Sequence, residues 1–201
     1  LASVTSSDPQ RLRIDLADFE NENYPNGGQP TQYQDRVIMH EFVHIAMNAN
    51  GVRQGTETWF NEGASEFIHG SADVFLNNRS DAQLDAMVAD AFNPSPINYG
   101  GAYIATVFLH NEIKAAGGAG LKDFFDELKS NGNDFDAALN TTTNGATTNI
   151  GVFKTDFAAA GGALARQLRD DSVTTGDTGA IGGAIVDGGQ VFTAESIVPN
   201  E

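Results

Sequence analysis

The sequence contains no cysteine, which excludes disulfide bridges and thiolate metal ligands, so any bound metal must be held by histidine and carboxylate side chains. Basic residues are also scarce: 11 lysines and arginines stand against 27 aspartates and glutamates, for a formal net charge of −16. Nucleic acids and anionic membranes are recognised through basic patches, so this balance argues against both as partners. Solubility is the simplest role for the excess acidity.

Long apolar runs are absent as well. No segment approaches the roughly 20 consecutive apolar residues that a membrane-spanning helix needs. The opening LASVTSSDPQ lacks the basic start and apolar block of a secretory signal, which predicts that the sequence is a processed or excised segment. With 201 residues, the chain can form one substantial domain, or one domain with an appendage.

Strand patterning is found near the beginning of the chain. In RLRIDLADF, residues 11–19, apolar side chains at 12, 14 and 16 alternate with polar ones at 13 and 15, which predicts a half-buried strand. Such a strand could also be the edge on which an extended peptide substrate pairs. The segment NENYPNGGQPTQ that follows is rich in Asn, Gly and Pro and predicts a loop.

Helical patterns dominate the middle of the chain, and one helix start carries a capping box formed by Ser80 and Gln83. The predicted helices are Asp35–Asn48 with Asp35 as N-cap, a second that begins near Thr56 to Thr58 and runs until Gly70, and then Ser80–Phe92, Gly101–Ala115, Leu121–Ser130, Asp134–Leu139 and Val152–Leu168, the last interrupted at Gly161 and Gly162.

Beyond Arg169 the composition becomes rich in Gly, Thr and Asp. This predicts an extended or β-hairpin connector, with a flexible tail as the alternative. We therefore divide the chain into a domain of residues 1–168 and a C-terminal segment of residues 169–201.

The stretch VIMHEFVHIAMN, residues 37–48, carries the clearest chemical signal. His40 and His44 lie one turn apart on the predicted helix, so both imidazoles can bind one ion. Glu41 lies about 100° around the helix and can reach a water on that ion without being a ligand. This is the His-Glu-x-x-His pattern of zinc peptidases, in which the metal acidifies a water and the glutamate accepts its proton. A chance match has a probability on the order of one percent, so a third ligand is needed as support.

The stretch WFNEGASEF, residues 59–67, supplies a candidate third ligand. Glu62 and Glu66 lie one turn apart on an otherwise apolar helix, where burying a carboxylate costs free energy unless it has a partner. Catalytic zinc takes three protein ligands, and two histidines with one glutamate is an established set. We expect Glu62 to be the third ligand and Glu66 to accept the free ring N–H of one zinc histidine, with His40 as the first choice. A solvated carboxylate on the helix surface is the alternative for Glu66.

Together these motifs resemble the gluzincin class of metallopeptidases, in which HEFVH would supply two ligands and the base, and NEGASE the third ligand. The longer run HEFVHIAMN…WFNEGASEFIHGSADV is similar to bacterial collagenases, and more closely to flagellinolysins, the metallopeptidase domains inserted in bacterial flagellins. The similarity covers roughly residues 35–74. The segment between His44 and Glu62 is one residue shorter than in the thermolysin and aminopeptidase groups.

The resemblance implies an α+β, thermolysin-like zincin fold with a small N-terminal mixed sheet, an active-site helix, a glutamate helix and a helical C-terminal subdomain. It implies Zn²⁺ as the cofactor, a peptide or protein substrate outside the cell, and display on the surface of a flagellar filament, where neighbouring flagellin subunits would be partners.

Ca²⁺ is a second candidate cofactor. Acidic residues cluster at Asp18, Glu20 and Glu22 and again at Asp170 and Asp171, although neither cluster has the spacing of a recognisable calcium loop. Solvated surface charge is the alternative for both clusters.

Peptide hydrolysis also benefits from a hydrogen-bond donor to the developing oxyanion. Tyr99 and Tyr103 lie one turn apart, and the resemblance to collagenase-type enzymes favours a tyrosine in this role. We choose Tyr103 as the donor, with core packing as the alternative for both tyrosines. His69, at the end of its helix, is expected to cap that helix or lie at the surface. His110 has apolar neighbours in the sequence and is expected to be a core histidine.

These expectations combine into a zinc-dependent endopeptidase in which Glu41 takes a proton from the attacking water and delivers it to the leaving amine. One rival is a zinc aminopeptidase, which would need carboxylates that grip the free amine of the substrate. The other is a structural or adhesion domain of a flagellin that keeps zinc for folding and has no turnover. The presence of Glu41 argues against the latter, because a structural zinc site has no use for a base.

Overall fold

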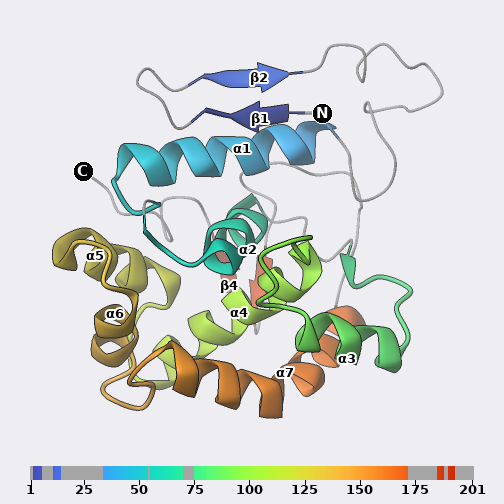
Figure 1. Ribbon diagram of the computed structural model, residues 1–201. Helices are drawn as coiled ribbons and strands as arrows, with labels where there is room; N and C mark the ends of the chain where they lie inside the picture. The colour runs from blue at the N-terminus through green and yellow to red at the C-terminus, as the bar shows by residue number, and fades with distance from the viewer. Residues whose placement is uncertain are drawn as a thin grey trace.

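The computed structural model is mostly helical and describes residues 2–5, 11–14, 34–53, 55–69, 75–171, 185–187 and 190–192. Within these ranges lie seven helices and four strands (Figure 1). The helices are α1 (Gln34–Ala49), α2 (Thr58–His69), α3 (Asp81–Ala89), α4 (Tyr99–Ala115), α5 (Leu121–Asn131), α6 (Phe135–Thr142) and α7 (Ile150–Asp171). The strands form two antiparallel pairs, β1 (Ala2–Val4) with β2 (Leu12–Ile14) and β3 (Ile185–Asp187) with β4 (Gln190–Phe192).

The expected α+β, thermolysin-like fold with a mixed sheet is wrong. Each described strand has three residues and pairs with one antiparallel neighbour only. The alternating pattern of residues 11–19 forms a strand at Leu12–Ile14, and residues 15–19 lie outside the described ranges. Two short strands offer too small a face to make a layer of the core, so the described core is built by helices packing on helices.

The predicted helices are confirmed, with differences at their ends. The capping box at the start of α3 forms as expected: the Ser80 hydroxyl accepts the backbone N–H of Gln83, and the Gln83 side chain accepts the backbone N–H of Ser80. Helix α1 begins at Gln34, so Asp35 lies within the first turn and not at the N-cap position. Helix boundaries shift by such amounts because capping and tertiary contacts decide the terminal residues.

Helix α7 continues through Gly161 and Gly162, where the sequence predicted an interruption, and ends at Asp171, beyond the boundary placed at residue 168. A Cβ on Gly161 would lie 2.8 Å from the Phe157 ring and 3.0 Å from Val88 of α3. The bare backbone therefore lets α3 approach α7 closely. This packing outweighs the low helix propensity of glycine.

Helix α2 lies between α1 and α4 and has two distinct faces (Figure 1). One face enters an aromatic core in which Trp59 stacks on Phe153 with ring centroids 5.3 Å apart and Phe60 meets Phe124 edge to face at 5.1 Å. Burying an aromatic side chain of this size contributes about 2–3 kcal/mol. The aromatic face thus fixes the rotation of α2 and directs its opposite face towards α1.

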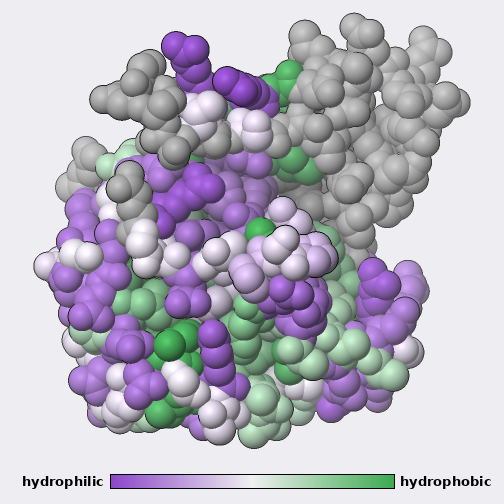
Figure 2. Space-filling view, in the orientation of Figure 1, coloured by the Kyte–Doolittle hydropathy of each residue, from purple (hydrophilic) through white to green (hydrophobic). Residues whose placement is uncertain are grey.

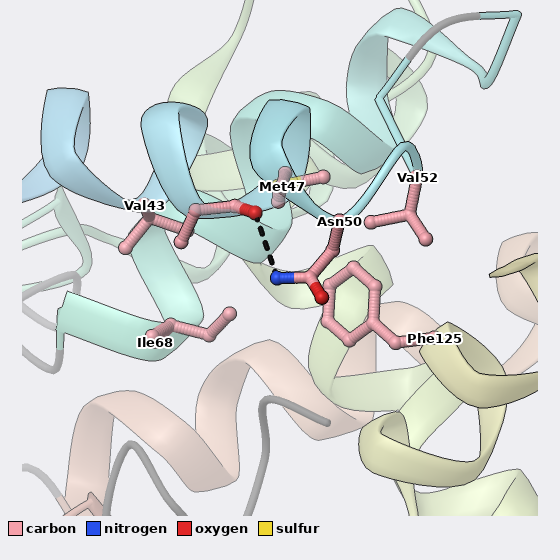
Figure 3. A pocket seen from close by; sticks show the side chains of 7 residues that line it. Val43, Met47, Asn50, Val52, Ile68 and Phe125 are labelled. Atoms are coloured by element: carbon pink, nitrogen blue, oxygen red, sulfur yellow. Dashed lines mark hydrogen bonds between the residues drawn. The ribbon is translucent and has the colours of Figure 1, made fainter. Parts of the chain in front are cut away.

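A small apolar pocket lies between α1, α2 and α5 (Figure 3). Its lining residues are Val43, Ala46, Met47, Asn50, Val52, Ile68 and Phe125. The Asn50 side chain donates a hydrogen bond to the Ala46 carbonyl at 3.0 Å, so its amide closes the last turn of α1. No ionisable side chain lines the pocket, so we assign it a role in packing and no catalytic role.

Charged and polar side chains cover most of the described face seen in Figure 2, with apolar side chains in smaller groups between them. This distribution agrees with the acidic composition of the chain. None of the described helices is long and apolar enough to cross a lipid bilayer.

Gly63 has no room for a side chain, because a Cβ there would clash with the backbone carbonyl oxygen of Ala102 and the hydroxyl of Thr106 on α4. We expect Gly63→Ala to force α2 and α4 apart and to lower the free energy of unfolding by about 2 kcal/mol, measured by urea denaturation. Gly151→Ala, at an exposed position in the first turn of α7, is the matched control and should be neutral or slightly stabilising. Equal stability of Gly63→Ala and wild type would contradict the close crossing of α2 and α4.

Candidate metal centre

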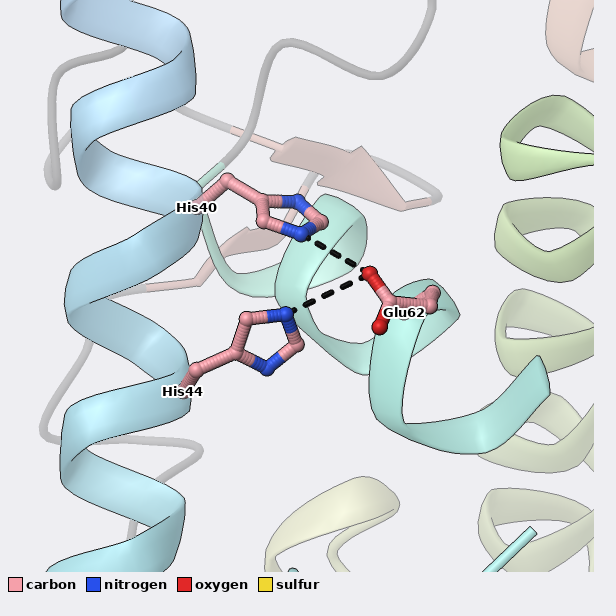
Figure 4. A group of neighbouring side chains, drawn as sticks. All are labelled: His40, His44 and Glu62. Carbon is pink, nitrogen blue, oxygen red and sulfur yellow. Dashed lines mark hydrogen bonds and ion pairs between the residues drawn. The ribbon is translucent and has the colours of Figure 1, made fainter. Parts of the chain in front are cut away.

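The crossing of α1 and α2 brings three candidate ligand atoms together (Figure 4). His40 Nε2 and His44 Nε2 point from one face of α1 to the same oxygen, Glu62 Oε2, at 3.0 and 3.3 Å. The two imidazole rings meet edge to face with centroids 4.6 Å apart. The three residues chosen from the sequence as ligands therefore converge on one point.

The spacing of these atoms fits a metal ion. Ligand bonds of about 2.1 Å at tetrahedral angles separate the ligand atoms by about 3.4 Å. The observed nitrogen–oxygen distances of 3.0 and 3.3 Å are close to this value, and all three ligand atoms lie within 4.8 Å of one another. The group is compatible with a metal ion after small side-chain adjustments.

Burial and charge set the protonation of the three residues. Burial would lower the pKa of His40, but the carboxylates of Glu62 and Glu66 outweigh it and raise the pKa of His40 to about 9. Burial lowers the pKa of His44. Burial would raise the pKa of Glu62, but its bonds with His40 and His44 outweigh it and lower the pKa of Glu62 to about 2. Without a metal at neutral pH, His40 is therefore cationic, His44 neutral and Glu62 anionic.

Ser65 lies behind the ring of His44. Its hydroxyl oxygen lies 3.1 Å from His44 Nδ1 and 2.9 Å from the carbonyl oxygen of Asn61. The carbonyl can only accept, so the hydroxyl hydrogen can go to Asn61 and leave Ser65 free to accept an Nδ1–H of His44. With its proton on Nδ1, His44 can bind a metal ion through Nε2.

Glu66 is 1% exposed and lies between two histidines, so the surface alternative for this residue is wrong. Its Oε1 lies 3.0 Å from His40 Nδ1, the histidine expected from the sequence, although the ring N–H is not aligned for a hydrogen bond. Its Oε2 lies 2.7 Å from His69 Nε2. Burial would raise the pKa of Glu66, but His69 and His40 outweigh it and hold the pKa well below its usual value. Glu66 is thus a buried carboxylate anion.

His69 ends α2 as the sequence predicted, but it is fully buried and not at the surface. Sequence reasoning missed the contacts of Ser65 and His69. Their positions carried a signal, because Glu62, Ser65, Glu66 and His69 follow one another at i, i+3, i+4 and i+7 and so share one face of a helix. That polar face is the one turned towards α1.

The two tyrosines occupy different environments. Tyr99, the first residue of α4, is 39% exposed, and its ring lies 5.8 Å from the His40 ring and stacks on Phe75. Tyr103, chosen from the sequence as the oxyanion donor, lies one turn further along α4 and is 6% exposed within the core. The structure thus brings Tyr99 close to His40. Glu41, the expected base, is partly exposed and follows His40 on α1.

His110 is a core histidine, as expected. It is 1% exposed, and its Nδ1 accepts the backbone N–H of Leu121 at 3.1 Å. It therefore satisfies the first turn of α5, whose N-cap residue is a glycine without a side chain to do so. His110 therefore has a structural role.

The calcium candidates receive no support from the described residues. Asp170 is exposed and accepts a hydrogen bond from Arg169 Nε at 2.8 Å, which agrees with the alternative of solvated surface charge. Asp18, Glu20 and Glu22 lie outside the described ranges.

Two groups of described side chains could hold a metal ion: His40 with His44 and Glu62, and His40 with Glu66 and His69. Both contain His40. All three members of the second group are buried, whereas Glu62 is partly exposed. A substrate can approach an ion only where the site reaches the surface, so the first group is the candidate for chemistry.

Neither protein-family models nor curated protein sequences nor solved structures give a match to this chain. The function is therefore inferred from the residues of the site.

The raised pKa of His40 should make the affinity of the site for metal ions depend on pH. A metal ion binds the neutral imidazole, so it must displace the proton that His40 carries below its pKa of about 9. His44 and Glu62 have lowered pKa values and release no proton in this range. We expect the affinity for Co²⁺ to rise about tenfold per pH unit between about pH 7 and pH 9 and to level off above, measured by calorimetric titration. An affinity independent of pH would contradict a cationic His40 in the metal-free protein.

Proposed function

We propose that this protein is a zinc-dependent endopeptidase of the gluzincin class that hydrolyses peptide bonds in extracellular proteins. The observation that carries the proposal is the convergence of His40, His44 and Glu62 on one point, with Glu41 next to His40 on the same helix. A site used only for folding would need no acidic side chain at position 41. The resemblance of HEFVH and NEGASE to gluzincins points to the same chemistry.

Zinc is the metal that this ligand set favours. Two imidazole nitrogens and one carboxylate suit zinc, whereas calcium and magnesium prefer oxygen ligands throughout. When bound, zinc acts as a Lewis acid that lowers the pKa of water and polarises a carbonyl group. The chain would supply three ligands, which leaves a coordination position for water or substrate.

The chain's own residues would perform the proton transfers. Glu41 would accept a proton from the attacking water and then deliver it to the leaving amine. Tyr99 would donate its phenolic O–H to the developing oxyanion, because it is exposed and its ring lies 5.8 Å from that of His40. Tyr103, the choice from the sequence, remains the alternative donor, with its buried position as the argument against it.

Display on a flagellar filament, with neighbouring flagellin subunits as partners, follows from the resemblance to flagellinolysins and is part of the proposal. The rivals are a zinc aminopeptidase and a flagellin domain that keeps zinc without turnover. Cleavage of peptides with blocked amino termini separates an endopeptidase from an aminopeptidase, since only the latter needs a free amine.

Glu41→Gln tests the proposed reaction. The variant removes the base but none of the three proposed ligands, so we expect a loss of about 10²–10⁴-fold in kcat for a peptide substrate, with the zinc content of wild type. Glu127→Gln on α5 makes the same chemical change in another part of the chain and should keep full activity. If wild-type protein binds one zinc ion and neither it nor Glu41→Gln cleaves any member of a broad peptide library, the enzyme hypothesis fails and the structural-domain rival stands.

Tyr99→Phe and Tyr103→Phe form a matched pair, because each removes one hydroxyl from α4. We expect Tyr99→Phe to lower kcat by about 10²-fold with little change in KM, since a donor to the oxyanion acts in the transition state. Tyr103→Phe should change kcat by less than about threefold. The opposite order of effects would assign the oxyanion to Tyr103.

A further inference from the structure

Glu66 carries a buried negative charge whose two oxygens face different histidines. Oε1 lies 3.0 Å from His40 Nδ1, and Oε2 lies 2.7 Å from His69 Nε2. Glu66 and His69 are 1% and 0% exposed. A carboxylate in such a place must be held by partners on both oxygens, because water cannot replace them.

The charges of the cluster match a divalent ion. Glu62 and Glu66 together contribute two negative charges, and His40 lies between them with Nε2 towards Glu62 and Nδ1 towards Glu66. A divalent cation at the three ligand atoms balances both carboxylates when His40, His44 and His69 are all neutral. His40 must then keep its one proton on Nδ1, facing Glu66, so that Nε2 is free to bind the metal.

We propose that His69 is a positioning residue of the metal centre: its Nε2–H holds Glu66 Oε2, and the fixed carboxylate orients His40 through Oε1. The inference rests on the proposed function, since it assigns a role towards the same metal. His69 lies seven residues after the proposed ligand Glu62 on α2, so both lie on the same face of the helix. That face also carries Glu66, whose carboxylate contacts the second proposed ligand His40 and is held by His69.

The contact between His69 and Glu66 is a hydrogen bond, and these two residues do not hold a second metal ion. Its length of 2.7 Å is typical of a charge-assisted hydrogen bond. Two ligands of one metal ion keep a separation of about 3 Å or more, because each bond is about 2.1 Å long. An ion in the second group would also need Nδ1 of His40, which would then have to give up the proton that faces Glu66.

The experiment compares His69→Leu with His69→Gln. Leucine has no donor, whereas the glutamine amide can place an N–H close to the position of the histidine Nε2–H. We expect His69→Leu to weaken Zn²⁺ binding by about tenfold or more, measured by competition with a chromophoric chelator, and His69→Gln to restore the affinity to within about threefold of wild type. The visible spectrum of the Co²⁺-loaded protein should shift in His69→Leu and return in His69→Gln, because it reports how the ligands are oriented.

A purely structural role for His69 gives a different pattern. In that case Zn²⁺ affinity and the Co²⁺ spectrum of His69→Leu equal those of wild type, and only the unfolding of the metal-free protein changes. Equal affinities, or a glutamine variant as weak as the leucine variant, overturn the proposal. Two equivalents of Zn²⁺ bound to wild type, with one lost in His69→Leu, overturn it as well, since His69 would then be a ligand.

A measurement on wild-type protein covers the case in which the leucine variant does not fold. In the Zn²⁺-loaded, ¹⁵N-labelled protein, imidazole NMR correlations should show His40 protonated on Nδ1 and His69 protonated on Nε2. A neutral His69 with its proton on Nδ1 cannot donate to Glu66 and overturns the proposal.

The outcomes also separate this inference from the proposed function. If wild type binds Zn²⁺ and cleaves peptides while His69→Leu binds Zn²⁺ equally well, only the role of His69 falls. If wild type binds no Zn²⁺, both proposals fall together.

Discussion

The need to balance two buried carboxylates on α2 organises the centre of this protein. Glu66 is 1% exposed and Glu62 is partly buried, and neither charge can be held there without cationic or hydrogen-bonding partners. The partners come from α1, as His40 and His44, and from α2 itself, as Ser65 and His69. Glu66 contacts both His40 and His69, and His44 contacts both Glu62 and Ser65, so the orientation of each imidazole ring depends on several residues of this helix face.

The aromatic core makes this arrangement possible by fixing α2 from the other side. Trp59 and Phe60 pack among phenylalanines of α5, α6 and α7, and the missing side chain of Gly63 lets α4 approach closely. Burial of the apolar face supplies the free energy that holds polar groups on the opposite face out of water. The candidate metal centre is thus supported by packing that has no chemical role of its own.

Much of the candidate site was predictable because it depends on spacing within single helices. His40 and His44 at i and i+4, and Glu62 and Glu66 at i and i+4, must share helix faces once the helices form. The contact between Glu66 and His40 was also expected from the cost of a buried carboxylate. The fold class was not predictable in the same way. The family resemblance implied a mixed sheet, and the alternating pattern near residue 12 does not say how many strands will pair with it.

The helices, the chemistry of the candidate ligand atoms and the exclusion of thiolate ligands can be read directly from the amino-acid sequence. Which residues from different helices meet depends on the tertiary structure. It placed the ring of Tyr99 5.8 Å from that of His40, and it buried His69 behind Glu66 where a helix end suggested the surface. The physical reason is that helix periodicity fixes directions around one axis, whereas contacts between helices depend on how two axes cross, and that crossing is set by packing over the whole core.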